Sequence, residues 1–167
     1  MNLKDLNIKI VDCKKCRLFK DAQNAVPGEG PENAKLMLVG QNPGAQEDEV
    51  GKPFIGRAGK FLDKVLEKNG FSHKDLFITN IVKHVTPENR KPQEDEICAC
   101  LPYLTEQIER IKPKIIVLMG NVAKEAPRKD GIIYVETVHP SAAMRFTKMR
   151  KRFEKDFSDL KDCIQHG

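Results

Sequence analysis

The sequence lacks any long uninterrupted run of apolar residues. No stretch approaches the roughly 20 residues that a membrane-spanning helix needs, and the first residues, Met1-Asn2-Leu3-Lys4-Asp5, lack the apolar segment of a signal peptide. We therefore expect a cytoplasmic, intracellular protein that does not bind membranes. Internal repeats, low-complexity segments and linkers are also absent, so the 167 residues are expected to form one domain, 1–167.

Cysteine is sparse, and neither sign of charge dominates. Five cysteines in a reducing compartment argue against a disulfide framework and for a metal site or free thiols. The net charge of +5, from 29 basic and 24 acidic residues, is a mild indication of a polyanionic partner. Basic residues concentrate between Arg145 and Lys155. A run of this kind is usually a solvated helix face, but its place after a candidate active-site loop favours phosphate binding.

Short apolar runs alternate with helical patterns along the chain. Strands are predicted at residues 36–39, 76–82, 114–119 and 132–138, and helices at 3–12, 58–66, 97–111 and 121–126. Pro102 is expected to kink or split the helix at 97–111. Residues 24–33 are expected to form a loop before the first strand. The alternation predicts an α/β fold, a three-layer α/β/α sandwich around a mainly parallel four-stranded sheet.

Polar residues follow the predicted strands. Gly40-Gln41-Asn42-Pro43-Gly44 comes after the first strand, Asn80 lies near the end of the second, and His139-Pro140-Ser141 follows the fourth. The carboxyl ends of parallel strands form the crevice in which α/β proteins bind ligands. We therefore expect these amides and the imidazole to converge on one site.

These motifs resemble those of the uracil-DNA glycosylase superfamily, in particular its iron–sulfur branch, family four. The matching segments are Gly40–Gly44 with Glu47-Asp48, residues 51–59, 79–83, 89–92 and 99–104, and His139-Pro140-Ser141. The resemblance implies an enzyme that flips uracil out of DNA and hydrolyses its N-glycosidic bond, starting base excision repair. Its partner would be DNA containing uracil or a related deaminated base, and we expect a monomer.

The resemblance also implies roles for single residues. Phe54 would stack on the flipped base and Asn80 would read its Watson–Crick edge. His139 would stabilise the negative charge that develops on uracil O2. Asn42 would orient the attacking water through its side-chain carbonyl.

Two features of the first loop depart from the family pattern. Gln41-Asn42 stands where typical iron–sulfur members carry Glu-Ala or Glu-Gly and where the most active uracil-specific branch carries Gln-Asp. Asn42 offers no negative charge to the sugar cation, so chemistry is expected to be slower than with an aspartate. Gly44 replaces the tyrosine that excludes thymine in the strictly uracil-specific branch. Glu47 then becomes the candidate for base selectivity, and a second deaminated or mismatched base is an expected substrate.

The segment after His139 is expected to contact DNA. The turn at residues 141–146, beginning at Ser141, would supply the wedge that fills the vacated base stack, with Met144 and Arg145 as candidates. Arg150, Lys151 and Arg152 would hold the phosphate backbone.

The resemblance implies a metal site as well. Cys13, Cys16 and Cys100 match family ligands, and His84 stands where the remaining cysteine is found. Cys98 is the fallback for the fourth ligand, although residues two apart on a regular helix point about 200° apart. We expect a 4Fe-4S cluster, with zinc as the alternative, and a free thiol at Cys163.

Two other functions are compatible with the sequence. One is a non-catalytic module that binds damaged DNA on the same fold. The other is an enzyme of another class, such as a small redox protein with a Cys/His metal. Release of free uracil would separate a glycosylase from the binding module.

Overall fold

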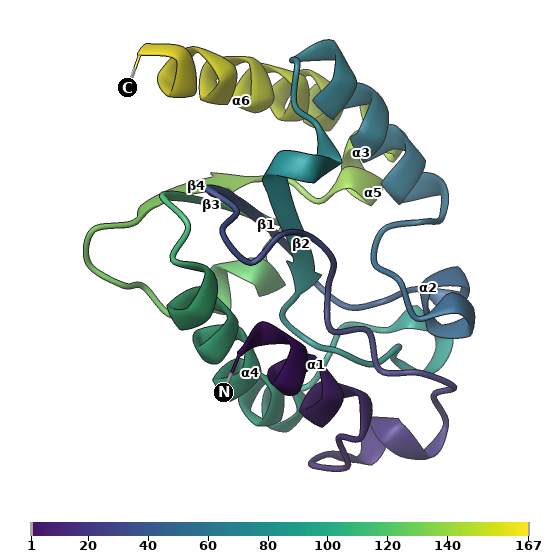
Figure 1. Ribbon diagram of the computed structural model, residues 1–167. Coiled ribbons are helices and arrows are strands. Elements are labelled where there is room, and N and C mark those ends of the chain that lie inside the picture. The colour runs from purple at the N-terminus through teal and green to yellow at the C-terminus, as the bar shows by residue number, and fades with distance from the viewer. Residues whose placement is uncertain (1, 167) are drawn as a thin grey trace.

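The computed structural model describes residues 2–166, and within them the strands form one four-stranded parallel sheet (Figure 1). The strand order is β2-β1-β3-β4. The strands are β1 (Leu36–Gly40), β2 (Leu76–Asn80), β3 (Ile115–Met119) and β4 (Ile133–Thr137); the α-helices are α1 (Leu3–Val11), α2 (Ala45–Val50), α3 (Arg57–Lys68), α4 (Glu94–Ile111), α5 (Pro140–Arg145) and α6 (Thr147–His166). Short 3-10 turns are η1 (Arg17–Lys20), η2 (His73–Asp75), η3 (Pro87–Asn89) and η4 (Val122–Glu125). The predicted fold class is confirmed.

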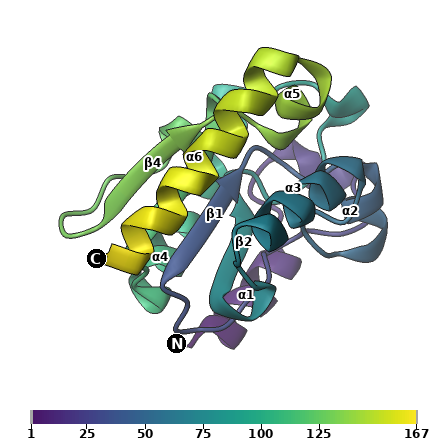
Figure 2. The same cartoon turned by 90° about the horizontal axis from the view of Figure 1, so that it is seen from above.

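Helices cover both faces of the sheet, as Figures 1 and 2 show. Alternate side chains of β1 point to opposite faces. Met37 and Val39 pack with α1 and α4, whereas Leu36 and Leu38 pack with α3, α5 and α6. Burial on both faces explains why β1 and β3 read as continuous apolar runs in the sequence.

Helix α4 is continuous, so the expected split at Pro102 does not occur. A proline inside a helix removes one hydrogen bond to the carbonyl four residues earlier, here that of Cys98. Cys98 is exposed, so this side of α4 faces solvent at the point where the hydrogen bond is lost. The buried stripe of Ile97, Leu104 and Ile108 holds the helix on the sheet across this point.

Two further local expectations are corrected. Residues 121–126 form the 3-10 turn η4 rather than an α-helix, and residues 141–146 lie mostly in the helix α5 rather than in a turn. The loop at residues 24–33 touches the sheet, because Glu29 pairs with Ile78 of β2 in an antiparallel bridge. Gly28 and Gly30 flank that pair with positive φ, and a Cβ at either position would collide with β2.

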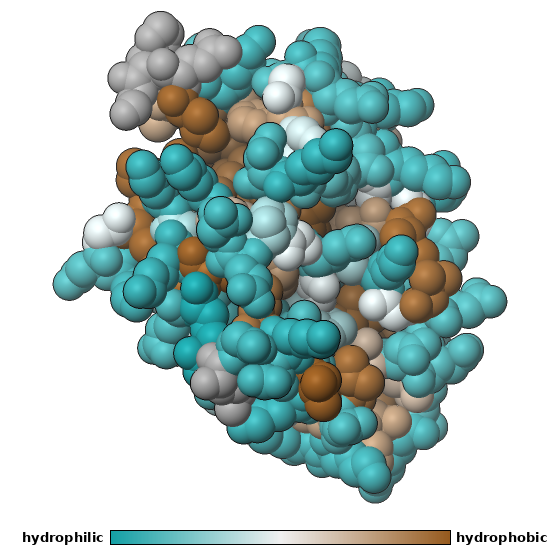
Figure 3. Space-filling view, viewed as in Figure 1, coloured by the Kyte–Doolittle hydropathy of each residue, from teal (hydrophilic) through white to brown (hydrophobic). Residues whose placement is uncertain are grey.

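The outer surface is polar over much of the face seen in Figure 3, where hydrophobic residues form separate small patches. Among residues 2–166, every helix is too short or too polar to cross a membrane.

A cluster of phenylalanines fastens α6 to the sheet and to α3. Phe153 is fully buried and packs against Phe61 and Phe157, with ring centroids 5.6 and 4.8 Å apart.

We expect Phe153→Ala to lower the free energy of unfolding by about 3–5 kcal/mol, because it leaves a cavity between α3 and α6. Phe146→Ala is the matched control: Phe146 is 55% exposed, and its loss should change stability by about 0.5 kcal/mol or less. Equal losses in urea unfolding would contradict this account of the core.

Candidate active site

The loops that follow the strands meet at the carboxyl edge of the sheet. Gln41 and Asn42 come after β1, Asn80 ends β2, and His139 follows β4. All four line one cavity of about 220 Å³, to which Phe54 also contributes. The structure thus brings together the residues that the strand ends were expected to bring together.

Asn80 presents a buried amide to this cavity. The parallel register places it directly beside Gly40 of β1. A Cβ on Gly40 would lie 2.6 Å from Asn80 Oδ1 and 2.5 Å from the Phe54 ring, so only glycine lets both side chains approach. Asn80 is 1% exposed, and its Oδ1 has no hydrogen-bond partner among the described residues. An unpartnered buried oxygen is costly, and a ligand that donates a hydrogen bond would satisfy it.

The Phe54 ring is held in place by an unusual backbone conformation. Phe54 has φ of 50°, in the left-handed region that a bulky residue rarely adopts. Gly59 in α3 makes this possible, because a Cβ there would overlap the Phe54 carbonyl group. The strained conformation lies beside the cavity, which is where such strain is commonly found.

The carboxylate of Glu47 holds the loop after β1 and the loop of Phe54 together. Its Oε1 accepts a hydrogen bond from Gly44 N (3.0 Å), and its Oε2 accepts from Ile55 N (2.8 Å) and Gly56 N (2.6 Å). The carboxylate therefore joins the loop after β1 to the loop that carries Phe54. Both oxygens are already bound, so the structure gives Glu47 a positioning role; its effect on base selectivity stays a prediction.

His139 is the N-cap of α5. Its Nδ1 accepts a hydrogen bond from Ser141 N (3.1 Å) and lies 2.8 Å from Ser141 Oγ. An accepting Nδ1 carries no proton, so the neutral imidazole is protonated on Nε2. Burial lowers the pKa of His139 to about 4, and the ring is therefore neutral at pH 7. His139 can donate one hydrogen bond through Nε2 without carrying a charge.

Asn89 also lines the cavity, although no role was expected for it from the sequence. Its side-chain Oδ1 lies 3.4 Å from Asn42 Nδ2, and both residues line the cavity. Asn89 has φ of 57°, a left-handed conformation that asparagine tolerates. Asn42 Oδ1 accepts from Gln41 Nε2 at 2.9 Å. The segment 89–92 was part of the family match, and its asparagine was the available signal.

The expected DNA-contacting residues lie on α5, on α6 and at the junction between them. Met144 is half-buried, whereas Arg145 and Phe146 are exposed. Arg150 donates to the carbonyls of Ala143 (3.1 Å) and Met144 (2.7 Å), so it caps the end of α5.

Lys151 and Arg152 are exposed on α6, and Arg152 lies 3.6 Å from Asp156. Phe146, the last residue of the segment expected to supply the wedge, has 55% of its surface exposed.

Three cysteines gather on the other face of the sheet. Cys13 and Cys100 belong to the core beside α1 and α4, with Cys16 packed against it. Burial raises the pKa of the Cys100 thiol to about 11, an effect that a hydrogen bond from the main chain of Lys83 partly offsets. Cys98 is exposed, so it lies on a different side of α4 from Cys100, as their spacing predicts; Cys163 is also exposed.

His84 lies in the turn after β2 and is buried. Its Nδ1 has no hydrogen-bond partner among the described residues, and burial lowers its pKa. Among the side chains that the structure describes, no three histidines, cysteines or acidic residues are arranged to hold a metal ion as they stand. The donor types are nevertheless those that metal centres use: the thiols of Cys13, Cys16 and Cys100 lie in one region of the core, and the buried Nδ1 of His84 lacks a partner among the described residues.

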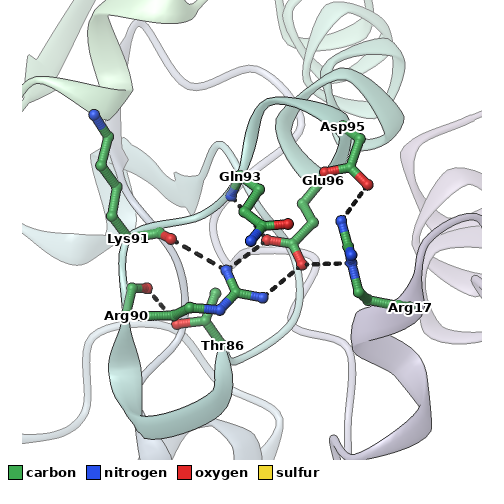
Figure 4. Close-up of polar contacts among 7 residues, drawn as sticks. All are labelled: Arg17, Thr86, Arg90, Lys91, Gln93, Asp95 and Glu96. Carbon is green, nitrogen blue, oxygen red and sulfur yellow. Dashed lines mark hydrogen bonds and ion pairs between the residues drawn. The ribbon is translucent and has the colours of Figure 1, made fainter.

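A charged network fastens the cysteine-bearing loop to α4 (Figure 4). Glu96 is fully buried and accepts two hydrogen bonds from Arg90, both 2.8 Å, and one from Gln93 N. Arg17, next to Cys16, approaches the same carboxylate at 3.2 Å and also pairs with exposed Asp95. The Arg90 hydrogen bond, above all, holds the pKa of Glu96 at about 2. The network therefore joins the loop of Cys16 to the segment that carries Asn89.

The sequence and this arrangement define the class of the protein. A family model described as the uracil DNA glycosylase superfamily matches residues 27–161. The matched range includes the loop after β1, Phe54, Asn80 and His139. The chain belongs to the uracil DNA glycosylase superfamily.

The chain is also similar to several type-4 uracil-DNA glycosylases. The chain is 41% identical to the type-4 uracil-DNA glycosylase of Saccharolobus solfataricus, over 98% of this chain and 87% of that protein. It is 41% identical to the type-4 enzyme of Pyrobaculum aerophilum, over 95% of this chain and 92% of that protein. A type-4 enzyme of Archaeoglobus fulgidus is 34% identical over the same shares.

The charged network generates a prediction about stability. Glu96→Gln leaves Arg90 and Arg17 facing a neutral group, so we expect the free energy of unfolding to fall by about 2–3 kcal/mol at pH 7. Asp95→Asn is the matched control, because its exposed pair with Arg17 should contribute about 1 kcal/mol or less.

The same network sets a pH dependence. The folded pKa of Glu96 lies below its ordinary value of 4.5. Its stabilisation is therefore present above pH 4.5 and is lost as pH falls toward 2. Urea unfolding at pH 7 and pH 3 should show the gap between wild type and Glu96→Gln narrowing at the lower pH. A gap that stays constant would contradict the assignment.

Proposed function

We propose that this protein is a monofunctional DNA glycosylase that removes uracil from DNA and so starts base excision repair. The observation that carries the proposal is the unpartnered Oδ1 of Asn80, which lines a cavity shared with Phe54 and His139. Uracil offers an N3–H donor to that oxygen and an O4 acceptor to the amide nitrogen. Cytosine offers the opposite pattern, so the same amide would mismatch it.

Phe54 would hold the flipped base by stacking. Aromatic faces bind bases with little sequence preference, so stacking supplies affinity while Asn80 supplies selection. The Glu47 hydrogen bonds hold the loop of Phe54 before any ligand arrives. A preformed pocket of this kind avoids the cost of ordering the loop during binding.

His139 would stabilise the leaving base. When the N-glycosidic bond breaks, its electron pair leaves with uracil and negative charge develops on O2. A neutral imidazole with its proton on Nε2 can donate a hydrogen bond to that charge. The low pKa keeps the ring in this neutral form at pH 7.

Asn42 and Asn89 would orient the attacking water. Their side chains lie together at the cavity, and their carbonyl oxygens can accept hydrogen bonds from water. Water then adds to the sugar carbon, and its proton passes to solvent. Neither amide carries a negative charge to stabilise the sugar cation, so we expect slower chemistry than an aspartate would give. Because Gly44 stands where a tyrosine would exclude thymine, we also expect removal of a second deaminated or mismatched base.

The DNA interface would extend along α5 and α6. Phe146 is large, apolar and exposed, beside Arg145 and one residue from the first turn of α6. Such a side chain is suited to insertion between base pairs, where it would fill the stack that the flipped base leaves. Lys151 and the neighbouring basic residues would bind phosphates.

The region around Cys13, Cys16 and Cys100 would hold a 4Fe-4S cluster. Cys13, Cys16 and Cys100 would supply thiolates, and His84 would supply its unpartnered Nδ1. The cluster would serve structure, tying α1 and its following loop to α4. Zinc is the alternative occupant of a Cys3His set.

Replacement of His139 tests the activity. His139→Ala should lower the single-turnover rate of uracil release by about 10²–10³-fold, because one preorganised donor to the leaving group is lost. Binding to an abasic-site duplex should persist. His73→Ala is the control, since that histidine is exposed and pairs with Asp63 away from the cavity. Wild-type protein that binds uracil-containing DNA without releasing uracil would favour the binding module instead.

Metal analysis tests the cluster. Protein purified without oxygen should be brown and contain iron, and His84→Ala should lose iron. Cys98→Ala should keep it, because that thiol is exposed on another side of α4, and Cys163→Ala serves as the second control. Colourless protein with stoichiometric zinc would refute the cluster, and iron loss in Cys98→Ala alone would refute the choice of His84.

A further inference from the structure

Lys83 is a fully buried lysine in the turn directly after Asn80. Its ammonium donates three hydrogen bonds: to Thr79 Oγ1 (2.7 Å), to the Asn80 carbonyl oxygen (2.7 Å) and to Gln107 Oε1 (2.8 Å). All three acceptors lie within 2.8 Å of its Nζ. Lys83 is thus bonded to the main chain of the residue whose side chain faces the base-binding cavity.

No carboxylate compensates this ammonium among the described residues. The three acceptors are neutral, and the ion pairs of residues 2–166 do not include Lys83. Burying a charge without a partner of opposite charge is costly. An apolar side chain of similar length would fill the same space at lower cost, so packing alone does not account for a lysine here.

The hydrogen bonds around Lys83 extend to α4 and to the loop at residues 24–33. Thr79 Oγ1 and Gln107 Nε2 both donate to the Pro27 carbonyl, each at 2.7 Å. The main-chain carbonyl of Lys83 accepts from Val26 N at 2.7 Å. Lys83 therefore contacts α4, which also carries Cys100, the loop at residues 24–33 and the end of β2 at Asn80.

We infer that Lys83 is a positioning residue that holds Asn80 in register for base reading and links it to α4 through Gln107. Asn80 is the last residue of β2, and the chain turns immediately after it. The ammonium bond to its carbonyl fixes the peptide at this end, and with it the direction of the amide side chain. The inference rests on the proposed role of Asn80 in reading uracil.

Inhibition by free uracil measures this positioning separately from catalysis. Lys83→Met keeps the length of the side chain and removes all three donors. We expect it to raise the inhibition constant for free uracil about tenfold, the loss of one charge-assisted hydrogen bond. Affinity for an undamaged duplex should stay within about twofold, since phosphate contacts dominate that binding. Lys4→Met, at an exposed position on α1, should change neither value.

Gln107→Leu separates positioning from packing. It removes one acceptor and the bond to Pro27 but leaves the bond from Lys83 to the Asn80 carbonyl. We expect lower stability and an inhibition constant for uracil within about threefold of wild type. Equal increases in Lys83→Met and Gln107→Leu would show that the network acts by packing alone and would overturn the inference.

The remaining outcomes also decide. An unchanged inhibition constant in folded Lys83→Met would refute the inference. If Lys83→Met does not fold, Gln107→Leu carries the test, and a tenfold increase in that variant would refute it. Wild-type protein that neither releases nor binds uracil would refute the proposed function instead, so the two failures are distinguishable.

Discussion

The carboxylate of Glu47 is the interaction on which the cavity depends. Three main-chain N–H groups from two loops converge on its oxygens, at 2.6 to 3.0 Å. Hydrogen bonds to a charged acceptor are stronger than those between neutral groups, so this single side chain can hold Phe54 in its left-handed conformation. Gly40 and Gly59 complete the arrangement by leaving room where a Cβ would collide.

The two faces of the sheet divide the work of the molecule. One face carries α3, α5 and α6, which position Phe54, His139 and the exposed basic residues. The other carries α1 and α4, which bury Cys13 and Cys100. Glu96 and Lys83 lie on this second side, yet each contacts a segment that lines the cavity. Buried charges here connect a structural region to a reactive one, and so the cavity depends on the packing of residues far from it.

The residues of the site were easier to predict from the sequence than the hydrogen bonds that position them. The strand ends and the family motifs indicated Asn42, Asn80 and His139, and the structure places all three at one cavity. Asn89 was missed, because nothing in a local pattern says which way a loop residue points. Glu47 was identified by its position, but the three main-chain groups that it binds belong to segments whose approach only packing determines.

Local pattern alone determined the alternation of strands and helices, the parallel sheet and the glycine-rich first loop. Periodicity of burial follows from backbone geometry, so it can be read without tertiary contacts. Tertiary structure decided whether α4 continues through Pro102 and what Lys83 contacts. Those outcomes depend on the free energy of contacts between residues distant in the chain. Such contacts leave no local trace in the sequence.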